Sequence, residues 1–534
     1  MEILVLSSLE KVFYDEKPKA EEISGFSMLK NERHSFQIAF YSEKSEKIKV
    51  ELSGALASYS KSFLVKTVPV GTACNDDADD YFLRKTSGDY PDYLEPIDGE
   101  ITAEDGKWQS VWIEISPDGE YAGKSELEVA FSNGGSKKIE IEVIDALLPK
   151  QSLVHTNWYH SDCLCNYYGF EALSDEFWET NENFIKTAVQ HGINCILTPL
   201  FTPPLDTKVG GERRTVQLVK VYKSGGKYRF DFRNLQKWID MCRRCGVEYI
   251  EFSHLFTQWG AKHAPKIIAI DRKGREKKIF GWSTDAKGRK YEEFLRTFAA
   301  ELIKFIDKND LRNRCFIHVS DEPSDKHLKT YRKHATLFEE IFPGFATFDA
   351  LSDFEFYKTG AVKLPVPCES DIEDFVGNVP ELWTYYCCGQ DKDNLPNRFM
   401  AMPSLRNRIL GFLLYKYEVK GFLQWGYNFY NLQYSVKAIS PYEITDAGGS
   451  FPSGDSFMVY PAKDKTPLAS LRLKVFYDGF QDMMALQLLE SKIGREKTLE
   501  LIENRQKLKF TSYPKDEKWF LETREKINQM IKEN

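Results

Sequence analysis

Apolar and polar residues alternate strictly in several segments of the first 150 residues, for example Lys47–Leu52, Val111–Ile115 and Lys138–Val143. A period of two gives each segment one buried and one wet face, which is typical of antiparallel strands in a sandwich. Turn sequences rich in glycine and aspartate separate these segments. We therefore predict an all-β sandwich over residues 1–150. The segment Ala73–Glu104 is rich in Asp, Tyr and Pro, so we expect a long loop that packs against the next domain.

After residue 150 the pattern changes to short apolar runs that alternate with helical periodicity. We predict eight strands, at Leu153–Trp158, Ile193–Pro199, Val247–Leu255, Cys315–Ser320, Ala346–Leu351, Lys363–Pro367, Leu382–Cys387 and Gly421–Trp425. Helices are expected between most of them, at Glu176–His191, Leu235–Cys245, Tyr291–Asn309, Asp325–Ile341 and Leu405–Tyr417, and after them at Leu468–Ile493.

Eight such alternations predict an α/β fold, a (β/α)8 TIM barrel over residues 151–493. The charged remainder, 494–534, is expected to be a helical C-terminal extension that wraps the barrel. A doubly wound open sheet is the alternative. No Gly-x-Gly-x-x-Gly follows a predicted strand, which counts against a dinucleotide-binding fold.

The fourth predicted strand leads directly into Asp321, Glu322 and Pro323. Proline cannot donate to a sheet ladder, so the strand is expected to end there. Carboxylates at the C-terminal end of a barrel strand indicate chemistry. The alternative is that this pair only caps the following helix.

The C-terminal ends of all barrel strands share one face, so other polar and aromatic side chains should gather around the pair. The expected substrate-binding residues are His160, His254, Trp259, Trp383, Tyr385, Trp425, Tyr427 and Asn428. Rings that stack on sugar faces, with polar tips that bind hydroxyls, would form a carbohydrate site. Each of these tryptophans could instead belong to the core.

Two adjacent carboxylates do not both ionise easily, so the pKa of one rises and it can act as a general acid. A conventional glycosidase places its two carboxyl groups across the scissile bond, about 5–5.5 Å apart for retention or roughly 6.5–9.5 Å apart for inversion. Neighbouring residues fit that arrangement poorly. They fit substrate assistance better, in which a 2-acetamido oxygen of the sugar attacks the anomeric carbon.

Composition narrows the class of protein. The 534 residues are 42% hydrophobic, 28% charged and 14% aromatic, with a formal net charge of −8. These are globular values that argue against nucleic-acid binding. No run of eighteen apolar residues predicts a membrane span. The N-terminus lacks the basic region of a signal peptide, so a cytoplasmic location is expected.

The ten cysteines do not form a recognisable metal or redox motif. Cys242 and Cys245 have redox spacing but lie at the end of a predicted helix, whereas redox pairs need a helix N-terminus. No other pair has a partner at zinc-finger spacing. We expect no structural metal.

Five motifs together resemble glycoside hydrolase family 123, the β-N-acetylgalactosaminidases, and the bacterial proteins that share its catalytic domain. They are His318–Pro323, Trp259–Pro265, Trp383–Cys388, Gly421–Phe429 and Gly454–Pro461, and they occur in the family's order. The resemblance implies a retaining exo-β-N-acetylgalactosaminidase that uses substrate assistance and neither a metal nor an organic cofactor.

The resemblance also implies residue roles. Glu322 would be the general acid/base, Asp321 would orient the acetamido group, Tyr385 would donate to the acetamido oxygen, and Trp425 would form a wall of the site. Without a secretion signal, the expected substrates are short imported oligosaccharides or glycosides.

Two other functions remain open from the residues. The first is a glycosidase on a sugar that lacks the acetamido group, with Asp349 or Glu369 as partner to Glu322. The second is a non-catalytic carbohydrate-binding protein in which Asp321 and Glu322 only cap a helix.

Overall fold

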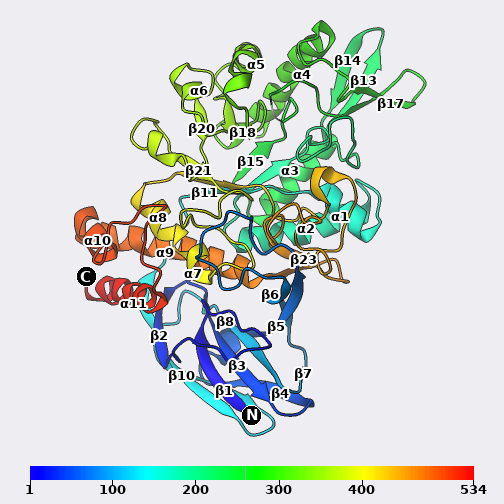
Figure 1. Cartoon of the computed structure of the whole chain (residues 1–534). Helices are drawn as coiled ribbons and strands as arrows, with labels where there is room; N and C mark the ends of the chain where they lie inside the picture. The colour runs from blue at the N-terminus through cyan, green and yellow to red at the C-terminus, as the bar shows by residue number, and fades with distance from the viewer. Residues whose placement is uncertain (259) are drawn as a thin grey trace.

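A computed structural model describes residues 1–258 and 260–534, except for the side chain of Asp325. Trp259, one of the expected substrate-binding residues, lies outside the described residues. Figure 1 shows a β-rich part that contains the N-terminus below a larger α/β part.

The β-rich part consists of two five-stranded sheets. The first has the order β1 (Glu2–Ser7), β3 (His34–Ser42), β8 (Lys107–Ile115), β5 (Ser60–Val70), β6 (Gly88–Pro96). The second has the order β2 (Gly25–Lys30), β10 (Ser136–Leu147), β9 (Gly123–Phe131), β4 (Glu46–Ser53), β7 (Glu100–Ala103). Alternating residues such as Ile139, Ile141 and Val143 are buried in one shared core, as the pattern predicts.

The expected long loop at Ala73–Glu104 is wrong in part, because it contains strands β6 and β7. Strand β6 carries Pro91 and Pro96, which are tolerated because it is an edge strand. The expected contact with the next domain is present: Tyr93 bridges to Ser470, and the carboxylate of Asp92 forms a buried ion pair with Arg472 at 2.6 Å.

The α/β part contains all eight predicted strands, each within three residues of its expected bounds. Six form one parallel sheet in the order β18 (Cys315–Ile317), β15 (Tyr249–Phe252), β12 (Cys195–Thr198), β11 (Val154–Asn157), β22 (Gly421–Gln424), β21 (Trp383–Tyr385). The parallel pair β19 (Phe348–Ala350) and β20 (Leu364–Val366) forms a second sheet. Isolated parallel bridges join His318 to Phe348 and Cys368 to Tyr385.

Helices surround these strands (Figure 1). Their bounds are α1 (Ser161–Tyr168), α2 (Asp175–Gln190), α3 (Arg233–Cys245), α4 (Arg289–Lys308), α5 (Leu328–Ile341), α6 (Glu355–Lys358), α7 (Ser404–Arg408), α8 (Leu410–Lys416), α9 (Leu471–Ile493), α10 (Arg495–Ile502) and α11 (Glu517–Glu533). Helix α9 begins where the Ser470 side chain accepts a hydrogen bond from the N–H of Leu473. It is buried on nearly all sides because it packs against α7, α8 and α11 and contacts β6. None of the described helices is long and apolar enough to cross a bilayer.

A small extra sheet is built from the segments that follow β12 and β15. Its order is β14 (Lys227–Asp231), β13 (Lys220–Ser224), β16 (Ile267–Ile270), β17 (Glu276–Phe280). It projects from the α/β part at the upper right of Figure 1. The sequence predicted no strands here, because each strand is short and the β13–β16 pairing joins distant segments. A further hairpin, β23 (Val459–Pro461) and β24 (Pro467–Ala469), follows β22.

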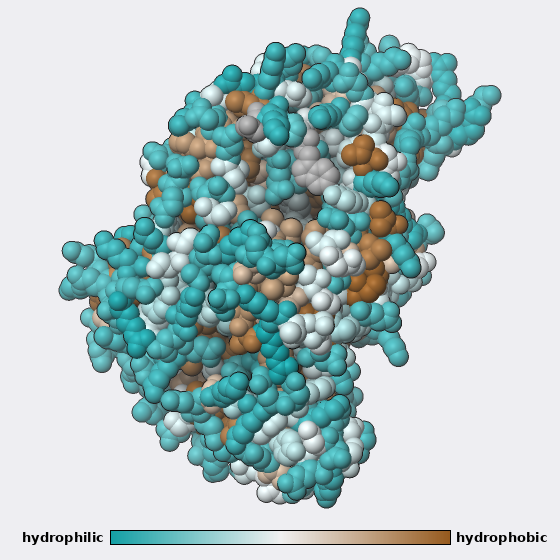
Figure 2. Space-filling view, viewed as in Figure 1, coloured by the Kyte–Doolittle hydropathy of each residue, from teal (hydrophilic) through white to brown (hydrophobic). Residues whose placement is uncertain are grey.

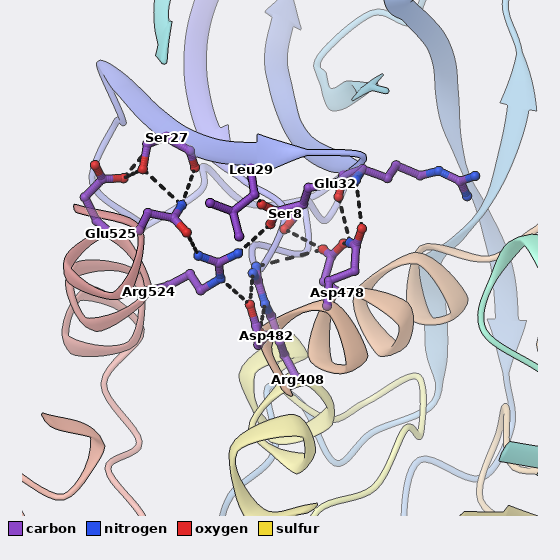
Figure 3. Close-up of polar contacts among 12 residues, drawn as sticks. Ser8, Ser27, Leu29, Glu32, Arg408, Asp478, Asp482, Arg524 and Glu525 are labelled. Carbon is purple, nitrogen blue, oxygen red and sulfur yellow. Dashed lines mark hydrogen bonds and ion pairs between the residues drawn. The ribbon is translucent and has the colours of Figure 1, made fainter. Parts of the chain in front are cut away.

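The C-terminal helix α11 lies against α9 of the α/β part and also against β2 and β10 of the β-rich part, a second contact that the sequence did not predict. Figure 3 shows the buried charges at this junction. Arg524 of α11 binds Glu32 and Asp482, and Arg408 also binds Asp482. Asp482 of α9 thus joins helices α7 and α11, and Arg524 extends the network to Glu32 of the β-rich part.

Candidate active site

Asp321 and Glu322 lie where the chain leaves β18, at the C-terminal end of the parallel sheet. Glu322 has a φ of 41°, a left-handed conformation that costs a non-glycine residue about 1–2 kcal/mol. Its N–H donates to the carbonyl oxygen of Ala350 at 3.1 Å, and the hydroxyl of Tyr385 donates to its Oε1 at 2.8 Å. Neighbouring strand ends therefore hold a strained backbone in place, as is common at functional sites.

The two carboxylates of the pair have different surroundings. Asp321 is buried, whereas solvent reaches the side chain of Glu322. Burial, and next the charge of Glu322, raise the pKa of Asp321 well above its ordinary value. Crowding by protein atoms also raises the pKa of Glu322, and the hydrogen bond from Tyr385 opposes that rise. Among the described residues, no lysine or arginine forms an ion pair with either carboxylate. The pair is therefore suited to hold a proton.

A buried histidine lies at the end of β18, below this pair. His318 Nε2 contacts Glu251, and its Nδ1 lies 3.2 Å from Asp349 Oδ1. Burial alone would lower the pKa of His318, but the bonds to Asp349 and Glu251 outweigh it and raise the pKa to about 9. His318 is thus an imidazolium at neutral pH, and its positive charge favours the ionised form of Asp321.

The two carboxylates around His318 are themselves fully bonded. Glu251 accepts from Thr156 and from Trp158 Nε1, the latter at 2.7 Å. Asp349 accepts the N–H groups of Val319 and Ser320 at 3.0–3.1 Å and the hydroxyl of Tyr331. Glu251 was not among the residues predicted from the sequence. A carboxylate inside a predicted buried strand could have indicated it, because a buried charge needs partners.

His254, His318 and Asp349 are the described groups whose positions come nearest to a metal site, with ligand atoms within 4.8 Å of one another. The two imidazole rings, however, are stacked 4.0 Å apart at 19°. Their in-plane lone pairs therefore run parallel instead of converging. Both nitrogens of His318 already face carboxylates. These side chains therefore suit a protonated histidine held between two carboxylates better than they suit a metal ion.

His254 has a second notable property. Its ring is buried, and neither of its nitrogens has a hydrogen-bond partner among the residues that the structure describes. Burial and the neighbouring His318 lower its pKa well below the ordinary value, so it is neutral. A neutral imidazole stacked on His318 can donate to or accept from a sugar hydroxyl.

Trp425, at the end of β22, is half-buried and is fixed by a carboxylate. Its Nε1 donates to Asp455 Oδ2 at 2.9 Å. Asp455 is fully buried, and burial raises its pKa to about 7 against the lowering effects of Arg398 and the Trp425 hydrogen bond. The charge of Glu322 raises the pKa of Asp455 further, so Asp455 and the pair interact electrostatically.

His160 and Asn428 bind each other instead of facing open space. The N–H of His160 donates to Asn428 Oδ1 at 2.8 Å, and Asn428 Nδ2 donates to the His160 carbonyl at 3.3 Å. His160 Nε2 lies 2.8 Å from the Trp425 carbonyl oxygen. Both residues are buried, so they support the position of Trp425.

Trp383 and Tyr427 are placed in the core. Trp383 is 1% exposed, packs against Phe316 and Phe348, and covers Gly421, where an added Cβ would lie 2.1 Å from its ring. The hydroxyl of Tyr427 donates to the carbonyl oxygen of Phe184 in α2 at 3.0 Å.

The two candidate partner carboxylates are also placed unfavourably. Asp349 is buried and fully bonded below the site, as described above. Glu369 is buried, neither of its oxygens has a partner in the described part of the chain, and its charge acts on Tyr386 and Tyr513. Both carboxylates are therefore buried, whereas solvent reaches Glu322.

Comparison with known proteins agrees with this arrangement. The profile of the glycoside hydrolase 123 catalytic domain matches residues 158–489. The chain belongs to glycoside hydrolase family 123. No curated protein sequence matches it.

Solved structures show the shared fold. A family 123 glycoside hydrolase from Clostridium perfringens, studied for glycolipid glycan hydrolysis, has a TM-score of 0.76 at 16% identity, covering 99% of this chain and 98% of that one. A Bacteroides ovatus GH5 xyloglucanase gives a TM-score of 0.32 at 10% identity, covering 86% and 99% of the two chains. Only the first likeness is close enough to inform the fold. The matched region of this family 123 chain contains Asp321, Glu322, Tyr385, Trp425 and Asp455.

Proposed function

We propose that this chain is a retaining exo-β-N-acetylgalactosaminidase in which the 2-acetamido group of the substrate is the nucleophile. The observation that supports this most directly is the Asp321–Glu322 pair. It stands at a strand end without a basic ion-pair partner among the described residues, and the pKa of each carboxyl is raised.

The proposal includes the architecture that presents the pair. The order of the six-stranded sheet, the β19–β20 pair and the two isolated bridges would place all eight strands in one closed ring, a (β/α)8 barrel. The domains would then be a β-sandwich at 1–150, the barrel at 151–493 and a helical extension at 494–534.

The pair can exchange a proton when substrate binds. In the free site, burial favours a proton on Asp321. An acetamido N–H directed at Asp321 would stabilise its carboxylate, as would the imidazolium of His318. The shared proton would then reside on Glu322, the solvent-reached member, which protonates the leaving oxygen.

The remaining groups have matching roles in the first step. The acetamido oxygen attacks the anomeric carbon, the glycosidic bond breaks, and an oxazolinium-like intermediate forms. Tyr385 would turn its hydroxyl from Glu322 to the acetamido oxygen, Trp425 would cover one sugar face, and His254 would bind a hydroxyl. Glu322, now ionised, then takes a proton from the water that opens the intermediate.

Rates of hydrolysis of aryl glycosides distinguish this proposal from its alternatives. We expect turnover of β-GalNAc and little turnover of the matching β-galactoside, with tight inhibition by a GalNAc-thiazoline that mimics the intermediate. Equal turnover of the galactoside would reject substrate assistance. If sugars bind but no glycoside is hydrolysed, the carbohydrate-binding alternative replaces the proposal.

Variants test the individual roles. Glu322→Gln should lower kcat/KM about 10²–10⁴-fold on an alkyl β-GalNAc and far less on the dinitrophenyl glycoside, whose leaving group needs no proton. Asp321→Asn should lose rate on both substrates. Glu381→Gln, which changes an exposed carboxyl two residues before β21, is the matched control. Full turnover of the alkyl substrate by Glu322→Gln would reject Glu322 as the acid.

The natural substrate class is part of the proposal. The similar Clostridium enzyme is described as hydrolysing glycolipid glycans. A terminal GalNAc on a glycan headgroup would suit an exo-acting site of this kind.

A further inference from the structure

The extra sheet β13–β14–β16–β17 carries a concentrated positive charge. Residues 220–231 and 266–280 contain ten Lys and Arg against three Asp and Glu, although the whole chain has a net charge of −8. Seen in the same view, this projecting sheet is strongly hydrophilic (Figures 1 and 2). A cationic module on an acidic protein indicates a specific anionic partner.

The cations around the β13–β14 hairpin are not neutralised by the protein. Among the described residues, Lys220, Lys223, Lys227, Arg229 and Arg272 form no ion pair with a carboxylate, and four of these five are exposed. The nearby Asp271 is instead held by Arg275 and Lys277. These free charges can therefore pair with a ligand.

The same hairpin forms a hollow of about 540 Å³. Arg229 lies over the ring of Tyr222 at 4.2 Å, and the two residues are cross-strand partners. Half-buried Ile270 adds an apolar surface beside them. A ring and an aliphatic side chain surrounded by cations match a sugar ring that carries anionic substituents.

The other face of the hairpin is anchored, so the hollow has a fixed shape. Tyr228 and Phe230 pack edge-on against Phe294 of α4, with ring centroids 5.0 Å and 5.6 Å apart. Aromatic packing of this kind holds a two-stranded hairpin that would be only marginally stable alone.

The position of the sheet connects it to the active site. Its strands come from the segments after β12 and β15, so they leave the parallel sheet on the side where Asp321 and Glu322 follow β18. Lys266 pairs with Thr202 of the neighbouring loop. A glycan whose terminal sugar is bound at Glu322 could thus extend toward the hairpin.

We propose that this hairpin is an accessory binding site for an anionic glycan, one that carries sulfate or carboxylate groups beyond the sugar to be cleaved. The inference rests on the proposed function for its link to the active site. The test below measures binding and not turnover. Loss of glycan binding would therefore count against the accessory site, whereas lack of glycoside hydrolysis would count against the proposed function.

The test is calorimetric titration of the full chain at low salt with chondroitin sulfate and oligogalacturonate, which distinguish sulfate from carboxylate recognition. At least one should bind, with an affinity that falls as salt is added, while neutral dextran should not bind. Lys227→Gln/Arg229→Gln/Arg272→Gln should weaken binding roughly tenfold or more. The thermal unfolding midpoint should change little.

Two controls make the result specific. Lys497→Gln/Lys507→Gln/Lys509→Gln removes the same charge from exposed positions elsewhere and should leave affinity unchanged. Tyr222→Leu should weaken glycan binding severalfold but not binding of inorganic polyphosphate. Equal losses of glycan affinity in both triple variants would overturn the proposal. So would tighter binding of RNA or of phosphatidylserine vesicles that is unchanged in Tyr222→Leu.

Discussion

At the scale of single residues, the site depends on how each carboxylate is buried. Asp321, Glu322, Asp349, Glu251 and Asp455 all have acidic side chains within one region, yet they do not all have the same partners. Glu251 and Asp349 hold His318, Asp455 holds Trp425, and only Glu322 is reached by solvent. The partners therefore divide these acids into supporting groups and reacting groups.

Tyr385→Phe tests the electrostatics of the acid. The Tyr385 hydroxyl now lowers the pKa of Glu322, so its removal should raise that pKa. Glu322 would stay protonated to higher pH, and the alkaline limb of the kcat/KM profile should move to higher pH. The lost hydrogen bond should also lower kcat/KM roughly tenfold to a hundredfold.

The matched control is a substitution at the neighbouring residue, Tyr386. Tyr386→Phe removes a buried hydroxyl that bonds to none of the described residues, so it should leave the alkaline limb in place. An alkaline limb that moves to lower pH in Tyr385→Phe would contradict this account of the pair.

At the scale of elements, close helix packing fixes the back of the α/β part. An added Cβ at Gly411 of α8 would lie 1.8 Å from the carbonyl oxygen of Gly479 in α9. The two helices therefore approach at a point where only glycine fits. Helix α9 in turn contributes Asp482 and Lys474 to contacts with the β-rich part and with α11.

Gly411→Ala should destabilise the protein by about 1–3 kcal/mol or more, because the helices must separate to admit a methyl group. Urea unfolding monitored by tryptophan fluorescence measures the change. Gly389→Ala, where an added Cβ meets nothing within 4 Å, should change stability by less than about 0.5 kcal/mol. A neutral Gly411→Ala variant would show that the two helices separate easily.

At the scale of the whole molecule, the buried charges of Figure 3 join three distant parts of the chain. Arg524, on the last helix, binds Glu32 near the N-terminus at 2.7 Å and Asp482 of α9 at 2.8 Å. These side chains are almost fully buried, so each charge depends on its partner. We expect the β-rich part and α9 to unfold together in the native chain.

Arg524→Leu should lower the free energy of unfolding by about 3–5 kcal/mol, since it leaves Glu32 buried without its cation. Burial raises the pKa of Glu32 and Arg524 opposes that rise, so the variant should raise this pKa further. A carboxyl with a raised pKa in the folded state is destabilising where it is ionised. The loss should therefore be larger at pH 8 than at pH 5.

Urea unfolding at both pH values checks this expectation. Lys532→Gln breaks an exposed ion pair of the same helix with Glu142 and should cost less than about 1 kcal/mol. A loss in Arg524→Leu that is the same at pH 5 and pH 8 would exclude Glu32 as its source.

The sequence alone determined the local elements and the reacting pair. Apolar periodicity located all eight strands of the α/β part, because a buried strand must be apolar wherever it packs. The position of Asp321 and Glu322 after an apolar strand, with the family motifs, identified the candidate acid. Periodicity missed β6, with its prolines, and the short strands of the extra sheet.

Tertiary structure decided which side chains surround the pair. Trp383 and Trp425 look alike in sequence, but one lies over Gly421 in the core and the other is held half-exposed by Asp455. His318, Glu251 and Asp349 become one charged cluster only when three strands lie side by side. The sequence sets what each residue can do, whereas burial and the charge of neighbours, which come from distant segments, set its pKa and its partners.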